Sequence, residues 1–510
     1  MGFKFLDIKM PPGFSENDLK EEVFRNIRTR DFTCFIENQS LDARNKNNIY
    51  WQMRLGVSSE SIRETVITED TSLIIPYKKR ARKVLVTGCG PSGFFSAYTL
   101  LLAGFDVTIV EQGSTAEIRN KDIIRFEKSG TLNESSNYAF GEGGAGTFSD
   151  GKLTSRTKTI SKEKRFIFDT YVTAGAPAEI AYLSKPHLGS DNLMKMVIQL
   201  RKMFEDKGGK VCFETEVTGI RIKGNKINAL ETSKGIMDAD YFVFATGHSA
   251  YKTYKMLIRS GVPFETKPFA IGTRAEHRQD MINLSQWGKP SLPGVSPSEY
   301  KLTFNAAGSL PVYSFCMCPG GRVVQATPYH GLSIVNGMSR YRRDTPFANA
   351  GIVAAVHPDR LANKKLDALG AIEVLNMLER KFYDFSDSYA SPACYISSFL
   401  RGKSGPLPSQ TSYPLGLVSA DFKELLPEEV YHSIRTALKD FCHKIRGFES
   451  GVILGLESKT SSPVRAIRDQ TGKSHAFENL YVTGEGSGFA GGIVSSAADG
   501  IKAALNIIRG

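Results

Sequence analysis

The N-terminal part of the chain shows a helical pattern followed by a strand pattern. After the capping residue Ser15, apolar side chains recur at about every fourth position through residue 27, which predicts an amphipathic helix. Residues 49–57 then form a strand pattern. Together these patterns predict a small α/β domain over residues 1–77.

A strand–helix–strand pattern begins after a short linker. The apolar run 83–88 predicts a buried strand, the apolar stretch behind it predicts a helix, and residues 106–112 predict a second strand. Glycines separate the first strand from the helix. This order is that of a βαβ unit, which builds a parallel sheet.

Helical and strand patterns alternate less regularly further along the chain. We expect Asp191 to cap a helix, and residues 210–247 contain four β-rich runs. Residues 250–475 are interrupted by Pro and Gly, with one clear helical pattern near residues 428–445, which predicts a mixed α+β domain. The chain then closes with a strand, a glycine cluster and a helix that has an apolar face.

The turn of the βαβ unit contains a dinucleotide-binding fingerprint. Gly88 makes the turn, Gly90 lets a pyrophosphate approach the backbone, and Gly93 lets helix and strand pack closely. Glu111 ends the second strand, where a carboxylate accepts hydrogen bonds from a ribose 2′-hydroxyl. An acid at this position disfavours a 2′-phosphate, so the pattern favours FAD or NAD over NADP.

Two segments far from the fingerprint favour FAD over NAD. A strand pattern ends in residues 245–247 (ATG), and residues 483–493 (TGEGSGFAGGI) lead into the last helix. Glycines there admit a ribityl chain, and the positive end of a helix dipole stabilises an anionic reduced flavin. We therefore predict bound FAD, held without a covalent bond because no residue here marks an attachment site.

Seven motifs together resemble a family of bacterial and archaeal proteins known as FAD-dependent dehydrogenases, whose members are largely uncharacterised. The most distinctive is FGEGGAGTFSDGKL at residues 140–153, and the resemblance covers residues 84–508. The other six are GCGPSGFFSAYTLLLAGFDVTIVEQG, ATGHSA, KPFAIGTRAEH, YSFCMCPGG, SSPVRAIRD and TGEGSGFAGGIVSSAADGIKAA.

The resemblance implies an α/β protein with a Rossmann-like FAD-binding domain built from both ends of the chain. That domain covers residues 84–249 and 476–510, residues 250–475 form an inserted α+β substrate domain, and residues 1–77 form the small N-terminal α/β domain. Motif and resemblance together place FAD on Gly88, Gly90, Pro91, Ser92, Gly93, Glu111, Gln112, Arg119, Gly143, Gly144, Ala145, Gly146, Thr147, Val217, Ala245, Thr246, Gly247, Gly484, Glu485, Gly491, Gly492 and Ile493.

Residues 146–152 also match the GxxxxGK part of a loop that binds ATP or GTP. Leu153 stands where that loop needs a Ser or Thr for magnesium, and no apolar strand leads into it. The resemblance instead makes this glycine-rich segment the loop beside the FAD pyrophosphate and flavin ring. Lys152 then neutralises a phosphate, reaches the ring or has a structural role.

Two cysteines and two histidines are further candidates for chemistry. Cys316 and Cys318 lie two apart on a predicted strand and hence on one face, where they are either a redox dithiol or small buried hydrophobes. His248 and His330 lie near glycine-rich turns and are either proton donors or structural residues. No cluster of residues has the spacing of a metal site.

Composition changes this picture little. The 65 Lys and Arg exceed the 53 Asp and Glu by 12, and residues 78–83 (KKRARK) hold five of these cations, but no aromatic residues interleave them. We therefore do not expect nucleic-acid binding. Seven scattered cysteines, no secretory signal and no apolar run long enough to span a bilayer indicate a cytoplasmic protein.

We predict an FAD-dependent oxidoreductase (dehydrogenase) in which a hydride passes through flavin N5. Its small-molecule substrate, its electron donor or acceptor, and its oligomeric state have no signature in the sequence. Only one dinucleotide fingerprint is present, so we expect reduction by the organic substrate itself or by a transiently bound nicotinamide. Two alternatives remain open: a flavoprotein that acts on RNA, and a non-catalytic flavin redox sensor or scaffold.

Overall fold

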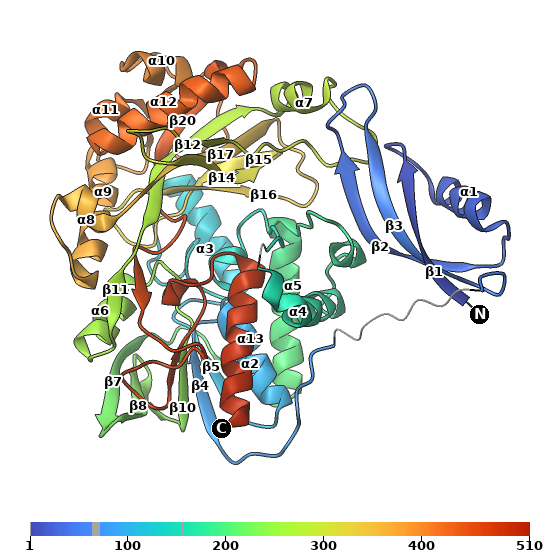
Figure 1. Ribbon diagram of the computed structural model, residues 1–510. Helices are drawn as coiled ribbons and strands as arrows, with labels where there is room; N and C mark the ends of the chain where they lie inside the picture. Colours follow the sequence, from blue (N-terminus) through green and yellow to red (C-terminus); the bar gives the residue numbers. More distant parts are fainter. Residues whose placement is uncertain (1, 64–71, 156) are drawn as a thin grey trace.

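The computed structural model describes residues 2–63, 72–155 and 157–510. Figure 1 shows three parts: a small N-terminal domain, a domain around a parallel sheet, and a domain around a larger, mostly antiparallel sheet. The first residues of the chain form the small domain, and the last helix packs in the parallel-sheet domain.

The N-terminal domain is a three-stranded antiparallel sheet, in the order β1-β3-β2, with one helix packed against it. Ser15 caps the helix and forms a capping box with Asp18, so the predicted helix start is confirmed. The elements are β1 (Gly2–Met10), α1 (Glu16–Ile27), β2 (Thr33–Asp42) and β3 (Tyr50–Ser59).

The small domain contacts both of the others. The backbone N–H of Gln39 in β2 donates to Tyr182 O at 2.9 Å, and Gln39 O accepts from the Ser184 N–H at 2.9 Å. A Cβ atom on Gly13 would lie only 2.9 Å from Pro293 Cβ in the large antiparallel-sheet domain. The N-terminal domain therefore bridges the two larger domains.

Within the described ranges, five parallel strands form the second sheet, in the order β22-β10-β4-β5-β6. Strand β22 lies beside β10, so the C-terminal segment joins the segment that starts at β4 in one domain, where Figure 1 shows the last helix. The elements are β4 (Lys83–Thr87), α2 (Pro91–Leu102), β5 (Asp106–Val110), α3 (Ala116–Ser129), α4 (Ser161–Thr173), α5 (Gly189–Asp206), β6 (Lys210–Cys212), β10 (Tyr241–Phe244), α6 (Tyr251–Arg259), β22 (Leu480–Val482) and α13 (Ile493–Arg509).

The antiparallel strands β7 (Val217–Lys223), β8 (Lys226–Thr232) and β9 (Gly235–Asp238) form a separate meander. Residues 210–247, all of which are described, thus hold five strands rather than the predicted four, because residues 213–216 separate β6 from β7. The prediction that Asp191 caps α5 is also wrong. The helix begins at Gly189, and the Asp191 carboxylate instead accepts the Tyr341 N–H at 2.8 Å.

The large domain is built on a seven-stranded sheet in the order β13-β14-β17-β12-β20-β18-β19, where only the β18–β19 pair is parallel among the described strands. The predicted helix near 428–445 is α12, but α9 was missed, because Gly370 in its first turn indicates a break by itself. The elements are β11 (Phe264–Thr266), β12 (Phe269–Arg278), α7 (Gln279–Trp287), β13 (Thr303–Phe304), β14 (Val312–Cys318), β15 (Gly321–Gln325), β16 (Val335–Ser339), β17 (Phe347–Val356), α8 (Pro358–Ala362), α9 (Ala368–Asp384), β18 (Ser391–Tyr395), α10 (Ile396–Arg401), β19 (Leu417–Ser419), α11 (Phe422–Leu425), α12 (Glu428–Lys444), β20 (Val452–Glu457) and β21 (Val464–Ala466).

The predicted α/β fold class, with a parallel-sheet domain completed by the C-terminal helix, is confirmed. The exact domain boundaries stay predictions, although the β11–β21 pair marks where the chain enters and leaves the large domain. None of the helices in the described part of the chain has the length and apolar character needed to cross a membrane.

We predict that Gly500→Leu destabilises the parallel-sheet domain by at least about 2 kcal/mol, because it overpacks the contact between α13 and α2. A Cβ atom on Gly500 would lie 2.1 Å from Ser92 O, which is backbone and cannot move aside. The free energy of unfolding, from urea titration, measures this change. Lys502→Leu, on the half-buried side of the same helix, is the control; equal stability of both variants would contradict the prediction.

Candidate active site

The predicted FAD-binding motifs follow the carboxyl ends of four parallel strands. Strands β4, β5, β10 and β22 end at Thr87, Val110, Phe244 and Val482, and a glycine or acidic motif comes directly after each. In a parallel sheet these ends share one edge, the crevice where ligands bind. The fold therefore brings together segments that are up to about 390 residues apart, such as Ser92 and Thr483, whose hydroxyls hydrogen-bond at 2.9 Å.

Backbones at this edge approach so closely that only glycine fits. A Cβ atom on Gly93 would lie 1.9 Å from Gly88 O, so the third glycine packs helix against strand as predicted. Gly88 itself has φ +101°, in the left-handed region. A Cβ atom on Gly144 would lie 2.9 Å from Gly90 Cα, so the glycine-rich loop packs directly on the dinucleotide turn.

Two helices begin at this edge without a side-chain cap among the described residues. Helix α2 starts after Gly90 and α13 after Gly492. A Cβ atom on Gly492 would meet no described atom within 4 Å, and one on Gly90 would meet only Gly144 Cα, at 3.7 Å. Open space before free helix N–H groups suits an anionic ligand such as a pyrophosphate. The residues present therefore fit FAD.

Glu111 is buried, and backbone amides surround its carboxylate. It accepts the N–H groups of Cys89 at 2.9 Å, Gly113 at 2.9 Å and Gly141 at 3.1 Å. The side chain thus ties the dinucleotide turn to the start of the glycine-rich loop. Its hydrogen bond to a ribose stays a prediction.

Arg119 is fully buried and binds the carbonyls that precede and form the glycine-rich loop. It donates to Asn137 O at 2.7 Å, Tyr138 O at 3.0 Å, Glu142 O at 2.8 Å and Gly144 O at 2.9 Å. Burial lowers the pKa of its guanidinium to about 10. Arg119 therefore fixes the shape of the loop, and a direct contact with FAD stays a prediction.

Sequence reasoning missed Glu142, the acidic residue inside the glycine-rich loop. Its carboxylate accepts the Ala116 N–H at 2.7 Å and pairs with Arg201 at 2.8 Å. Burial raises the pKa of Glu142 in spite of these contacts. The sequence did offer one signal for Glu142: an acidic residue between two glycines, inside a segment predicted to bind a cofactor, is a candidate for a structural contact.

The remaining predicted FAD contacts lie in the same turns and strand ends. The Thr147 hydroxyl donates to Glu142 O at 3.0 Å, Val217 is the first residue of β7, and burial raises the pKa of Glu485 to about 7. Their contacts with FAD, like the whole set, stay predictions. The others in these positions are Pro91, Gln112, Gly143, Ala145, Gly146, Ala245, Thr246, Gly247, Gly484, Gly491 and Ile493.

Lys152, the lysine of the GxxxxGK match, binds protein groups. Its ammonium donates to the Met317 carbonyl in β14 and forms an ion pair with Asp150 at 3.1 Å. Asp150 in turn pairs with Arg343 at 2.6 Å. These contacts support the structural alternative for Lys152 over a phosphate contact.

A cavity of about 380 Å³ lies where the glycine-rich loop meets the large domain. Polar and apolar side chains share its wall, as in sites for small organic ligands. The lining residues are Tyr138, Ala139, Ala145, Phe148, Ser149, His248, Ser249, Val324, Ala326, Asn336 and Lys459.

His248 contributes a free nitrogen to this cavity. Its Nε2 atom is buried and has no hydrogen-bond partner among the described residues. Burial, followed by the nearby charge of Lys459, lowers the pKa of His248 to about 3, so the ring is neutral at pH 7. His330, the other candidate, is exposed and contacts Tyr389, outside the cavity lining.

Lys459 forms a buried polar cluster behind the cavity, which sequence reasoning missed. Its ammonium contacts the Tyr251 hydroxyl and Glu379 Oε1, the latter at 2.8 Å, and Ser458 donates to the same carboxylate at 2.8 Å. Burial lowers the pKa of Lys459 well below its usual range and raises that of Glu379 to about 8. Lysine and carboxyl therefore hold one proton between them at neutral pH.

A second cavity, of about 530 Å³, lies beneath the start of α2. Apolar side chains such as Phe94, Leu200 and Phe204 line it together with predicted FAD contacts such as Gly90, Gly146 and Ile493. Its wall also includes Glu142 and Arg201, which pair with each other, whereas the wall of the cavity beside His248 carries a nitrogen without a partner among the described residues.

We predict that Gly90→Val reduces bound FAD to less than about a tenth of the wild-type amount, because its methyl groups fill the space before α2. The protein itself accommodates a Cβ there, so folding should be retained. Absorbance at the flavin band, with the released cofactor identified as FAD by chromatography, measures the loss. Thr99→Val, an isosteric change in α2, is the control, and full FAD occupancy of Gly90→Val would contradict the fingerprint assignment.

Comparisons with known proteins agree with these features. Residues 268–460 match the family model for "FAD-dependent protein, C-terminal domain-like". An uncharacterized protein of Clostridium beijerinckii is 36% identical over 503 residues, which cover 93% of this chain and 92% of that protein.

Solved structures are much more distant. Glycine oxidase from Bacillus cereus is 13% identical, with a TM-score of 0.33 over 84% of this chain and 95% of its own. L-proline dehydrogenase from P. horikoshii is 14% identical, with a TM-score of 0.35 over 85% and 94%. Similarity this low does not bear on substrate or reaction. The clostridial relative and the family model do carry weight: the chain belongs to the same family as the Clostridium beijerinckii protein, a family of FAD-dependent proteins, and FAD is its cofactor.

Proposed function

We propose that the protein is an FAD-dependent oxidoreductase that exchanges a hydride with a small organic substrate in the cavity beside His248. The observation that carries this proposal is the buried His248 Nε2, which lacks a partner among the described residues. Leaving such an atom unpaired costs about 1–3 kcal/mol. A substrate that hydrogen-bonds to it recovers that energy and is thereby oriented.

The lining of the cavity supports a small organic substrate with polar groups. Arg274 donates to Asn336 Oδ1 at 3.0 Å, so the amide nitrogen of Asn336 is the atom of this side chain that can donate to a ligand. The wall therefore offers polar groups from both domains around an apolar patch that includes Phe148 and Val324.

Bound FAD supplies a two-electron acceptor or donor that takes or gives a hydride. The chain supplies the electrostatics around it. The uncapped start of α13 at Gly492 stabilises negative charge nearby through its helix dipole. The glycine-rich loop, held by Arg119, supplies Ala145 to the cavity wall and so brings the predicted cofactor loop next to the substrate.

Lys459 is the group that we assign to proton transfer. Oxidation of an alcohol or amine carbon releases a proton together with the hydride, and this proton needs an acceptor. Burial favours the neutral amine of Lys459, and Glu379 lies 2.8 Å from it. The lysine therefore accepts the substrate proton, and the carboxyl beside it holds the amine in position.

The alternative of an RNA-acting flavoprotein has no specific support. The basic linker packs on its own domain: Arg80 lies over the Phe105 ring, Arg82 over the Tyr241 ring, and Lys83 pairs with Asp238 at 3.1 Å. A non-catalytic flavin sensor would not need a cavity with an unpaired His248. The donor experiment below separates it from an enzyme.

We predict that an organic donor, rather than a nicotinamide, reduces the bound flavin rapidly. The large domain has no second strand–glycine–helix unit in the residues that the structure describes, so a tight nicotinamide site is not expected. Anaerobic mixing with amino acids, amines, 2-hydroxy acids, NADH and NADPH, followed by flavin absorbance, tests this. Saturable bleaching at micromolar NADH or NADPH would contradict the expectation, and no bleaching with any donor would favour the sensor.

We predict that Lys459→Met lowers the rate of flavin reduction by the best organic donor at least about tenfold, with FAD content unchanged. Because burial lowers the pKa of Lys459, the wild-type rate should persist to a lower pH than it would with an ordinary, solvent-exposed lysine as the base. Lys252→Met, an exposed lysine outside the cavity lining, is the control. Equal rates in both variants would exclude Lys459 as the proton acceptor.

A further inference from the structure

Strand β14 is irregular at the two cysteines that the sequence analysis singled out. Its pairing with β17 is regular up to Phe315 and shifts between Phe315 and Cys318. Cys316 has φ +41°, a left-handed conformation that costs about 1 kcal/mol or more for a residue with a Cβ atom. The expectation that the two side chains simply share one face of a strand is therefore wrong, because the bulge reorients Cys316.

The bulge places the Cys318 thiol on the backbone of Cys316. Cys318 Sγ donates to Cys316 O at 3.3 Å, and each thiol shifts the pKa of the other. A regular extended strand would hold the Cα atoms of residues i and i+2 near the upper limit of the distances found in disulfides. Both cysteines are free, Cys316 is half-buried and Cys318 is fully buried.

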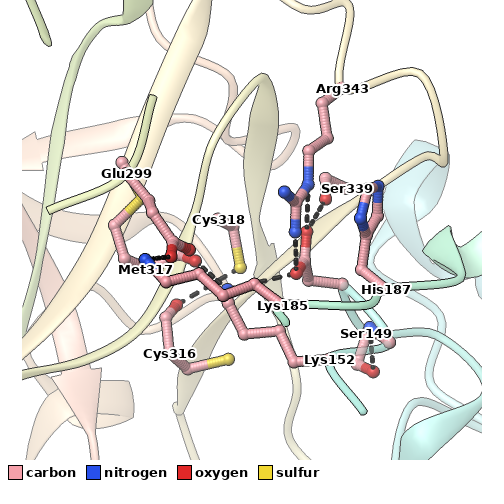
Figure 2. A network of polar contacts seen from close by, with 12 residues as sticks. Ser149, Lys152, Lys185, His187, Glu299, Cys316, Met317, Cys318, Ser339 and Arg343 are labelled. Atoms are coloured by element: carbon pink, nitrogen blue, oxygen red, sulfur yellow. Dashed lines mark hydrogen bonds and ion pairs between the residues drawn. The ribbon is translucent and has the colours of Figure 1, made fainter. Parts of the chain in front are cut away.

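Figure 2 shows that Lys152 reaches this bulge from the glycine-rich loop. Its ammonium donates to the Met317 carbonyl, between the two cysteines. From the other side, Arg274 in β12 donates to Cys316 O at 3.3 Å. The titratable and charged groups that face the thiol pair are Lys152 and Asp150 from the loop, Arg274 from β12, Glu457 from β20 and Tyr300 before β13.

We propose that Cys316 and Cys318 form a reversible dithiol–disulfide couple that reacts with low-molecular-weight disulfides by thiol–disulfide exchange. Half-buried Cys316 is the attacking thiol, and fully buried Cys318 is the resolving thiol. This site is distinct from the proposed substrate cavity, whose wall contains neither cysteine.

The exchange has two balanced steps. The Cys316 thiolate attacks one sulfur of a disulfide RSSR, forming a mixed disulfide and releasing one RS⁻. The Cys318 thiol then loses its proton and attacks Cys316 Sγ, forming the intramolecular disulfide and releasing the second RS⁻. In sum the protein dithiol loses two electrons and two protons, and RSSR becomes two RSH.

The electrostatics match this division of roles. Contact with the Cys318 thiol, and then the charges of Lys152 and Arg274, lower the pKa of Cys316 to about 6 against the effect of burial. The pKa of Cys318 is raised, first by Cys316 and then by burial. At neutral pH the accessible thiol is therefore the ionised one.

The test uses the full-length, FAD-loaded protein and oxidised glutathione. After incubation at defined ratios of reduced to oxidised glutathione, free thiols are trapped by alkylation and trypsin cuts after Lys301 and Arg322. Peptide 302–322 contains Cys316 and Cys318 and no other cysteine, so exposed Cys34 does not interfere. We expect oxidised glutathione to yield this peptide without alkyl groups and two hydrogen atoms lighter than the unmodified dithiol sequence, and reduced glutathione to restore the doubly alkylated form.

Single variants separate the two roles. Cys318→Ser should stop at one glutathione on Cys316, because the resolving thiol is missing. Cys316→Ser should give no adduct on buried Cys318. If the peptide stays a dithiol in the folded protein at every ratio but is oxidised after unfolding in urea, or if Cys318→Ser carries no glutathione, the proposal is wrong.

A second measurement does not depend on disulfide formation. The rate of Cys316 alkylation by iodoacetamide should rise with pH through about 6, where the thiolate forms, and then level off. Lys152→Met should lower the rate at pH 6.5 at least about fivefold, because it removes a cation beside the thiolate. Lys185→Met, whose ammonium pairs with Glu299 at 2.6 Å in the same region, is the matched control. Equal rates in both lysine variants, or a rate that rises only above pH 8, would overturn the assignment.

Discussion

The buried guanidinium of Arg119 holds the loop on which the rest of the molecule's chemistry depends. Four backbone carbonyls, from Asn137 to Gly144, accept its hydrogen bonds, and no side-chain carboxylate does so among the described residues. A buried cation is tolerated only when its donors are satisfied, so the loop cannot open without exposing an unpaired charge. This one loop contacts three functional regions and fixes their relative positions. They are the dinucleotide turn, the cavity wall at Ala145 and the β14 bulge that Lys152 contacts.

The parts that the sequence could predict are those in which function and local backbone geometry coincide. Gly88 and Gly93 could be predicted because both requirements lie within six residues of the chain. The turn requires glycine at position 88, and the close contact between helix and strand requires it at position 93. The last helix was identified for the same reason, since its apolar face recurs along one short segment. Here the identity of each residue follows from its own neighbours in the chain.

The parts that could not be predicted depend on partners far away in the chain. The role proposed for Lys459 depends on its contact with Glu379, which lies 80 residues earlier in the chain. The structural role of Lys152 depends on its contact with Met317, which lies 165 residues later. Glu111 shows the same limit. Its position after a strand indicates a ribose contact, but the three backbone amides that it binds come from three separate turns. No periodicity in the sequence encodes such encounters, because they arise only when the domains pack.

The N-terminal domain restricts how a substrate can enter. Its strand β2 continues by backbone hydrogen bonds into residues 182–184 of the parallel-sheet domain, and its Gly13 packs on Pro293 of the large domain. A hinge rotation that opened the two large domains would have to break one of these two contacts. The N-terminal domain therefore opposes rigid-body opening of the cavity that lies between the two large domains.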